Sequence, residues 1–512
     1  MNILMERFHF PEELSQVVEH SPSVIVPESK ETLFELIFGN KRTDKIEVGY
    51  EIEGKLVKEA NVVRCRNGAV VNYAEDYMRR RDPDSMRVAD ELPTDKPRFE
   101  EVYGYPFSEA RGETMRWLAT QELILVPFKA GGYDYGYEAV LVCPRNAAFF
   151  AFALSQLQAF INIREVESFT PRAIIYVAPP FRHTRFNGKQ VVVHSRQEGL
   201  HEIFSYNLYP GPSAKKGVYS VLLDIGEQEG WVTAHASAAR IITPYENEMV
   251  MMHEGASGGG KSELLQDVRR EEDGRVLVGE NTVTGTRHYI SMSDTCTIEP
   301  VTDDMAICHP SFQPANGKLA LADGEDGWFV RVDGITEYGS DPTYERISIH
   351  TKEPLIFFNL QGVPRATCLL WEHALDSDGS TCPNPRVIIP RRMIDRVVKT
   401  PVEVDVRSPV TASWGLCTSC PPPWPGCGGW WRPEDTITPA SAPTRPWPAR
   451  GWAPIGPLPP VSGWSRPTSC WGRSWIAPPP GTCSSPTSIS ASTRSASPPS
   501  GSPGSTWPAG AA

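Results

Sequence analysis

The residues best suited to chemistry in this chain form a glycine-rich segment, residues 255–262, with the pattern G-x-x-x-x-G-K-S. A glycine-rich backbone can turn its amide groups inward around phosphate oxygens, and this pattern is typical of a nucleotide-binding P-loop. Lys261 would neutralise the β- and γ-phosphates, and the Ser262 hydroxyl would bind Mg²⁺. The alternative is a flexible surface turn that is rich in glycine. The residues expected to hold ATP or GTP are Gly255, Ser257, Gly258, Gly259, Gly260, Lys261 and Ser262.

An acidic pair, Asp303-Asp304, follows Lys261 after a gap of 42 residues. A P-loop needs a carboxylate at the end of a second strand to hold its metal ion. Adjacent carboxylates attract divalent cations and repel each other, so we expect this pair to supply the metal ligand. A solvated turn is the alternative. A second acidic group, residues 323–326, is a weaker candidate that we expect to form a surface turn.

Two lysines and a histidine precede the P-loop, in the segments Lys215-Lys216-Gly and His235-Ala-Ser-Ala. Taken alone, the lysines suit an exposed basic pair and the histidine suits a core position. Their order with the P-loop and the Asp-Asp pair resembles the phosphoenolpyruvate carboxykinase family. The P-loop ending Lys-Ser-Glu is similar to HPr kinase, a relative with the same core. The chain therefore resembles a divergent bacterial branch of this superfamily.

The resemblance implies a site for two metal ions and a nucleotide. Lys216, His235 and Asp304 would be ligands of a transition-metal ion, typically Mn²⁺, and Asp303 would face the nucleotide-bound Mg²⁺. Lys215 would contact the substrate or its phosphate. A lysine can bind a metal only when it is neutral, so burial and the cation itself must lower its pKa.

Two further residues would meet a small anionic substrate. The resemblance implies that Tyr209 lies near it and that Arg81 binds its carboxylate; the alternative for Arg81 is an exposed basic turn. The match covers about residues 170–365, and the gap between Lys261 and the acidic pair is longer than in the family. The expected catalytic residues are Lys261, Lys215 and Arg81.

Strands and helices must position these residues. Short apolar runs predict buried strands, and residues 144–163 predict a helix packed against them. The apolar stretch 147–163 is too short and too polar to span a bilayer, so we expect it to be buried. One strand should lead into the P-loop and a helix should lead out of it. Together, these strands, helices and the P-loop predict an α/β or α+β fold with two domains, in an arrangement like that of phosphoenolpyruvate carboxykinase. Strands are expected at 173–177, 191–194, 249–252 and 355–358, and domains at 1–205 and 206–410.

The composition changes at about residue 411. The 102 residues from 411 to 512 hold 10 of the 14 Trp, 22 of the 48 Pro and five of the 11 Cys, with no Lys, Phe or Tyr. A disordered Pro/Ser-rich tail is one interpretation, but such tails avoid Trp and Cys. Reading a GC-rich gene in a shifted frame would turn Leu and Val codons into Cys and Trp codons. We therefore expect a frameshift product here, which leaves the nucleotide domain incomplete.

Charge and composition argue against some classes of function. A net charge of -12 argues against wrapping nucleic acid, which needs a clustered basic face. The chain shows no secretory signal pattern, and its scattered cysteines predict reduced thiols, so we expect a cytoplasmic protein that does not bind membranes. The expected partners are a nucleotide and a small anionic substrate. Phosphoryl transfer is the leading hypothesis; an HPr-type protein serine kinase, a non-catalytic nucleotide-binding module and an inactive truncated product are the alternatives.

Overall fold

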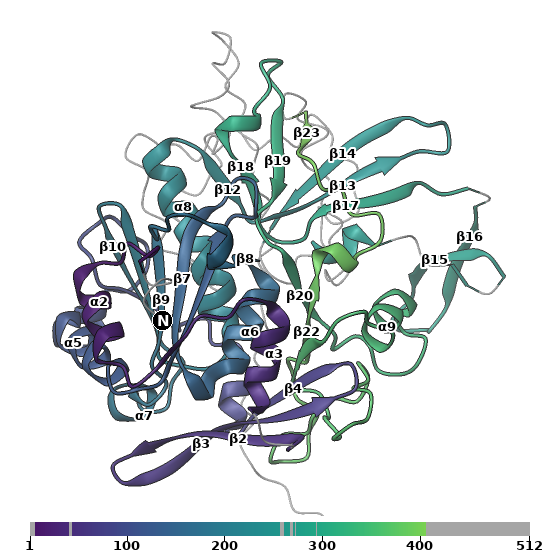
Figure 1. Cartoon of the computed structure of the whole chain (residues 1–512). Helices are drawn as coiled ribbons and strands as arrows, with labels where there is room; N and C mark the ends of the chain where they lie inside the picture. The colour runs from purple at the N-terminus through teal and green to yellow at the C-terminus, as the bar shows by residue number, and fades with distance from the viewer. Residues whose placement is uncertain are drawn as a thin grey trace, which may run out of the picture.

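The structure of the chain is a computed structural model that describes residues 6–39, 43–255, 261–266, 270–271, 273–292 and 294–405. Within these ranges the chain has a mixed α/β fold with five sheets, which confirms the expected fold class (Figure 1). Five P-loop residues and the region from 411 to 512 lie outside the described residues. The P-loop residues concerned are Ala256, Ser257, Gly258, Gly259 and Gly260.

The largest sheet has eight strands, and its central strands are buried on both faces. In β9, Ile174 and Tyr176 enter one hydrophobic core, while Ala173, Ile175 and Val177 enter the other. This alternation explains the continuous apolar run, which confirms the strand predicted at 173–177. The order is β1-β6-β7-β9-β11-β10-β5, with β8 paired to β6. The strands are β1 (Val24–Ile25), β5 (Met86–Val88), β6 (Leu123–Ala130), β7 (Tyr137–Pro144), β8 (Ala159–Phe160), β9 (Ala173–Val177), β10 (Val192–Gln197) and β11 (Leu200–Ser205).

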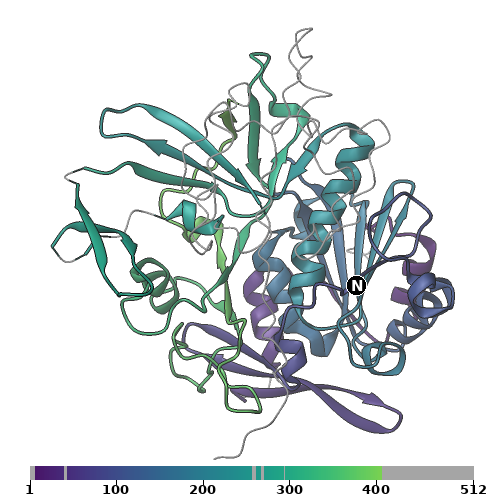
Figure 2. The same ribbon diagram turned by 180° about the vertical axis from the view of Figure 1, so that it is seen from behind.

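Helices cover both faces of this sheet (Figures 1 and 2). Helices α2 and α5 bury apolar residues in the core on one face, and α3, α6 and α8 do so on the other. Among the described residues, none of the helices is long and apolar enough to cross a membrane. The helices are α2 (Glu12–His20), α3 (Lys30–Phe38), α4 (Phe99–Tyr103), α5 (Phe107–Leu118), α6 (Ala148–Leu157), α7 (Phe181–Arg185), α8 (Lys216–Glu229) and α9 (Pro342–Ile349).

Helix α6 is shorter than the helix expected at 144–163. All ten of its residues are buried. It ends where Gln158 takes an extended conformation, with φ -113° and ψ 162°, and the next two residues pair with β6 as strand β8. The apolar run is thus divided between a helix and a strand, because pairing with the edge of the sheet competes with helical continuation.

A six-stranded sheet joins segments that are distant in the sequence. Strand β4 pairs in parallel with β21, and Gly68 makes their close approach possible: a Cβ at Gly68 would lie 1.9 Å from the Leu355 carbonyl oxygen. This sheet contains strands from both of the predicted domains, 1–205 and 206–410. The domain boundaries therefore stay a prediction. The strands are β2 (Lys45–Ile52), β3 (Lys55–Cys65), β4 (Gly68–Tyr73), β21 (Leu355–Phe358), β22 (Arg386–Pro390) and β20 (Gly327–Arg331), in that order.

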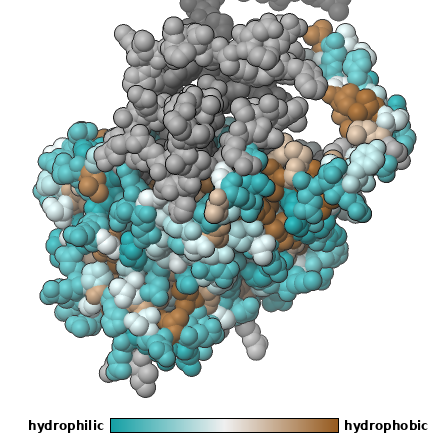
Figure 3. Space-filling model, turned by 90° about the horizontal axis from the view of Figure 1, so that it is seen from above, coloured by the Kyte–Doolittle hydropathy of each residue, from teal (hydrophilic) through white to brown (hydrophobic). Residues whose placement is uncertain are grey.

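Three smaller sheets complete the described fold. One has the order β12-β18-β19-β23, the second has the order β14-β13-β17, and β15 with β16 forms a two-stranded sheet with exposed apolar side chains. Seen from above, the described surface is mostly hydrophilic with local apolar patches (Figure 3). The strands are β12 (Val232–Ala234), β13 (Ala236–Ile242), β14 (Glu248–Glu254), β15 (Arg275–Glu280), β16 (Arg287–Ser291), β17 (Thr297–Thr302), β18 (Ala306–Cys308), β19 (Leu319–Asp323) and β23 (Val402–Val404).

Candidate functional site

The order of the β14-β13-β17 sheet brings three predicted segments to one edge. Strand β13 is antiparallel to both of its neighbours, so its first residues lie beside the last residues of β14 and β17. His235 directly precedes β13, the P-loop begins at Gly255 after β14, and Asp303 follows β17. The Gly255 amide donates to the His235 carbonyl oxygen at 3.3 Å. Sheet pairing therefore assembles the histidine, the start of the P-loop and the acidic pair.

Helix α8 brings the two lysines to the same place. A π-helical turn, Gly211–Lys215, precedes the helix, and Lys216 is its first residue. Such turns are rare and frequently occur at functional sites. Strand β12 follows α8, and His235 comes directly after β12. The lysines on the helix and the histidine before β13 are therefore joined by a short segment of the chain.

Asp304 is the centre of the cluster that these segments form. One carboxylate oxygen, Oδ1, lies 2.7 Å from His235 Nε2 and 3.3 Å from Lys261 Nζ. The other, Oδ2, lies 3.0 Å from Lys216 Nζ and 3.3 Å from Lys215 Nζ. The Lys216 and His235 nitrogens are 3.2 Å apart. Three lysines and a histidine thus surround a single carboxylate.

Burial controls the protonation of this cluster. Burial lowers the pKa of Lys216 to about 8, against the attraction of Asp304, and lowers the pKa of His235 to about 4. Burial opposes the charge on Asp304, but Lys216, His235, Lys215 and Lys261 outweigh it and hold its pKa well below the ordinary value. The Lys216 amine and the His235 imidazole are therefore the groups of the cluster that most readily become neutral donors.

The second half of the acidic pair contacts the P-loop. Ser262 Oγ donates to Asp303 Oδ1 at 2.6 Å, and burial raises the pKa of Asp303. Lys261 Nζ donates to the Gly255 carbonyl oxygen at 2.9 Å. Asp303 and Asp304 follow strand β17, and neither is exposed, so the expected strand-end position is confirmed and a solvated turn is excluded. After Ser262 the described chain makes a 3₁₀ turn, Ser262–Leu265, where a helix was expected.

Glu325, in the acidic turn at residues 323–326, is also part of the site, and the expectation that this turn lies at the surface is wrong. Glu325 is only 3% exposed, and its Oε2 accepts a hydrogen bond from Lys215 Nζ at 2.8 Å. Asp323 accepts from the indole Nε1 of Trp328 at 3.0 Å. The turn joins two buried strands, β19 and β20, and Asp326 N donates to the end of α6. An acidic turn set tightly between two apolar runs was the signal that could have identified Glu325.

Of the predicted substrate residues, Arg81 is within electrostatic range of both Tyr209 and Asp304. Tyr209 is buried, and its hydroxyl accepts a hydrogen bond from Asn384 Nδ2 at 2.9 Å. The pKa of Arg81 is lowered to about 10, chiefly by burial and then by the positive charge of Arg386, while Tyr209 and Asp304 oppose this shift. Arg81 is partly buried and acts electrostatically on the central carboxylate, which argues against a solvated basic turn.

In the described part of the chain, no group of three or more His, Cys, Asp and Glu side chains is placed to hold a metal ion. The set formed by Lys216, His235 and Asp304 differs because one of its donors is an amine. Its donor atoms lie within 2.7–3.2 Å of one another. Two nitrogens and a carboxylate oxygen suit a transition-metal ion once the lysine is neutral.

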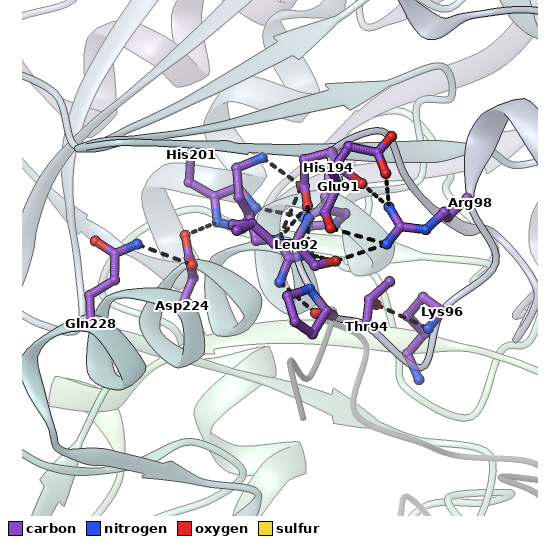
Figure 4. A network of polar contacts seen from close by, with 12 residues as sticks. Glu91, Leu92, Thr94, Lys96, Arg98, His194, His201, Asp224 and Gln228 are labelled. Atoms are coloured by element: carbon purple, nitrogen blue, oxygen red, sulfur yellow. Dashed lines mark hydrogen bonds and ion pairs between the residues drawn. The ribbon is translucent and has the colours of Figure 1, made fainter. Parts of the chain in front are cut away.

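A second buried polar cluster links α8 to strands β10 and β11. His194 Nδ1 and His201 Nε2 are 2.9 Å apart, and His201 Nδ1 lies 3.0 Å from Asp224 Oδ2 (Figure 4). Gln228 Nε2 donates to Asp224 Oδ1 at 3.2 Å. Burial lowers the pKa of His194 well below its ordinary value, so this ring is neutral. No pattern in the sequence predicted this network.

A comparison with models of protein families identifies the family of this chain. The family model described as "Domain of unknown function (DUF4914)" matches residues 10–425 of the 512 residues. No curated protein matches the chain. The matched region includes every residue of the cluster around Asp304 and the network around Asp224. Because the match extends over most of its length, the chain belongs to the DUF4914 family.

Proposed function

We propose that this chain binds ATP or GTP and transfers a phosphoryl group in a metal-dependent reaction, with an architecture and site that resemble phosphoenolpyruvate carboxykinase. One observation carries the proposal: Lys216, His235 and Asp304 converge with the P-loop lysine, Lys261, at the edge of one sheet. These residues come from segments separated by up to 88 residues (216 to 304), in the order that the resemblance requires.

The energetics of the cluster support an anionic ligand. Like charges brought together in a buried site disfavour one another, and Lys215, Lys216 and Lys261 all approach Asp304. Such arrangements are found at functional sites, where the ligand or the reaction supplies the compensating charge. The phosphates of a nucleotide and a small anionic substrate are ligands of the required charge.

The residues also fit the two metal ions. Lys216, His235 and Asp304 would hold Mn²⁺, because burial favours the neutral forms of the amine and the imidazole while the carboxylate stays charged. Ser262 and Asp303 would hold Mg²⁺ beside the P-loop through their hydroxyl and carboxylate oxygens. When bound, the ions would neutralise the charge on the transferring phosphoryl group.

The chain's own side chains would position the reactants. Lys261 would stay paired with the phosphoryl oxygens during transfer, since its ammonium carries three donors on a flexible stem. Lys215 and Arg81 would hold the anionic groups of the substrate, and the buried Tyr209 would limit the space open to water. Most of the rate enhancement would come from this preorganised charge.

The proposal is tested by measuring ATP and GTP binding and turnover by the purified full chain with Mg²⁺ and Mn²⁺, in the presence of oxaloacetate. We expect Lys261→Ala to abolish nucleotide binding, and Lys216→Ala and His235→Ala to remove the dependence on Mn²⁺. Lys55→Ala and His288→Ala, at exposed positions, are the matched controls. If Lys216→Ala and His235→Ala keep the Mn²⁺ dependence of the wild type, the carboxykinase-like assignment fails. Transfer of labelled phosphate to a protein would favour the HPr-type kinase instead.

We also propose that residues after about 411 are the product of a shifted reading frame. The family match ends at residue 425, close to the change in composition. Sequencing the gene tests this: a single-base insertion or deletion near codon 411 is expected, and an intact frame there would refute it. If the frame is shifted, the binding and turnover measurements should be repeated with the restored chain, since part of the nucleotide domain would be missing.

A further inference from the structure

A buried carboxylate that the proposed reaction does not yet use stands beside the cluster. Glu325 lies in the turn between β19 and β20 and is 3% exposed. Its Oε2 accepts a hydrogen bond from Lys215 Nζ at 2.8 Å. Its Oε1 is buried and has no hydrogen-bond partner among the described residues. Burying a carboxylate oxygen without a hydrogen-bond partner costs free energy, so such an atom indicates a functional role.

The turn that carries Glu325 is held firmly in place. The Glu325 amide donates to Asp323 Oδ1 at 3.1 Å, and the Gly324 amide donates to the Met305 carbonyl oxygen at 2.8 Å. A Cβ at Gly324 would lie 3.0 Å from Ile307 Cγ2, so the turn packs directly on the segment that follows Asp304. The position of the Glu325 carboxylate is therefore fixed relative to the central carboxylate.

The two lysines compete for one oxygen of Asp304. Lys216 Nζ lies 3.0 Å from Asp304 Oδ2, and Lys215 Nζ lies 3.3 Å from the same atom. Glu325 gives Lys215 a second and closer partner, at 2.8 Å. Without it, both ammonium groups would depend on the same carboxylate oxygen, and Lys215 could displace Lys216 from its place beside His235.

We propose that Glu325 is a positioning residue of the phosphoryl-transfer site: it holds Lys215 apart from Lys216, so that one lysine meets the substrate and the other stays with His235 and Asp304. The free Oε1 is then open to a donor group, a hydroxyl or a water molecule, of the bound substrate, since a carboxylate oxygen can only accept. This inference rests on the proposed function, because it assigns Lys215 to the substrate.

The test is a double-mutant cycle with Glu325→Ala, Lys215→Ala and the combined variant, assayed for turnover of nucleotide with oxaloacetate and Mn²⁺. Misplacing a reacting group by about 1 Å costs on the order of a hundredfold in rate, so we expect Glu325→Ala to lower kcat about a hundredfold and leave KM for the nucleotide within about twofold. Because Glu325 acts through Lys215, it should have little further effect in the Lys215→Ala background.

Two more variants separate positioning from folding. Glu325→Gln keeps the size and one acceptor oxygen, so it should fold and retain more activity than Glu325→Ala; it decides the question if the alanine variant does not fold. Asp326→Asn makes the same chemical change one residue later, where the carboxylate pairs with Lys30 at 2.7 Å, and should behave as the wild type.

The outcomes are distinguishable. If the wild type neither binds nor turns over nucleotide, the proposed function fails regardless of Glu325. If the wild type is active and both Glu325 variants keep its kcat and KM, the positioning role is refuted. It is also refuted if the effects of Glu325→Ala and Lys215→Ala on kcat simply multiply in the combined variant, since independent action leaves no coupling between the two residues.

Discussion

Two buried polar clusters share helix α8, and they differ in how their charges are balanced. At the first residue of the helix, Lys216 joins two other lysines around Asp304. Eight residues later, Asp224 closes a chain of hydrogen bonds through His201 to His194. The first cluster gathers like charges from distant segments, whereas the second joins two histidines to a single carboxylate.

This contrast indicates which kind of buried polar cluster is suited to a ligand. Histidines and an aspartate can satisfy one another with hydrogen bonds, so a buried network of these types is compatible with a purely structural role. Converging ammonium groups cannot satisfy one another and are tolerated where something else brings negative charge. The number of like charges around Asp304, more than the presence of His235, separates the candidate site from the network around Asp224.

The largest expected effect comes from removing the central carboxylate by Asp304→Asn. The change leaves three lysines buried without their shared partner, which should cost about 3–5 kcal/mol of unfolding free energy and reduce nucleotide turnover by about two to three orders of magnitude. Urea denaturation and turnover assays measure the two effects. Turnover within twofold of the wild type would show that the cluster is structural, like its neighbour on α8.

The corresponding change in the second network, Asp224→Asn, should separate stability from activity. It weakens the hydrogen bonds to His201 and Gln228, and we expect a loss of about 1–3 kcal/mol in unfolding free energy. Once folded, the variant should keep the nucleotide binding and turnover of the wild type. A large loss of turnover with unchanged stability would contradict the division between the two clusters.

A smaller effect is expected from the pH dependence of stability. The pKa of folded His194 is lowered by burial, so its contribution is fully present above the unfolded value of about 6.5 and is lost as the pH falls toward the folded value. The unfolding free energy should fall by up to about 1.4 kcal/mol per pH unit below pH 6.5 from this group. His235, with its pKa lowered to about 4, acts in the same direction.

Urea titrations of the wild type and of His194→Asn at pH 7.5, 6.5 and 5.5 measure this slope. The variant should show a shallower dependence, because one of the two buried histidines no longer resists protonation. Equal slopes in the two proteins would mean that His194 takes up a proton in the folded state, and that the network is not held neutral.

Local patterns predicted the parts of the fold that depend on neighbouring residues. The strands at 173–177 and 355–358 were predicted with their observed bounds, because apolar runs of this length suit strands buried on both faces. The apolar run at 144–163 is buried, as predicted, but only part of it is a helix. Its end pairs with β6 as strand β8, a long-range contact that the local pattern does not show. The acidic turn at 323–326 was predicted to be exposed because its composition is polar; its burial depends on α6 and on Arg391.

The order of the chemical residues can be read from the sequence: the lysine pair, His235, the P-loop and the acidic pair, each beside an element that could present it. Their meeting at one place depends on the tertiary structure. Strand β13 lies between β14 and β17, so their ends share one edge, and the β19–β20 turn places Glu325 against Lys215. Strand order and turn packing are set by contacts between residues far apart in the chain, which local pattern and spacing do not encode.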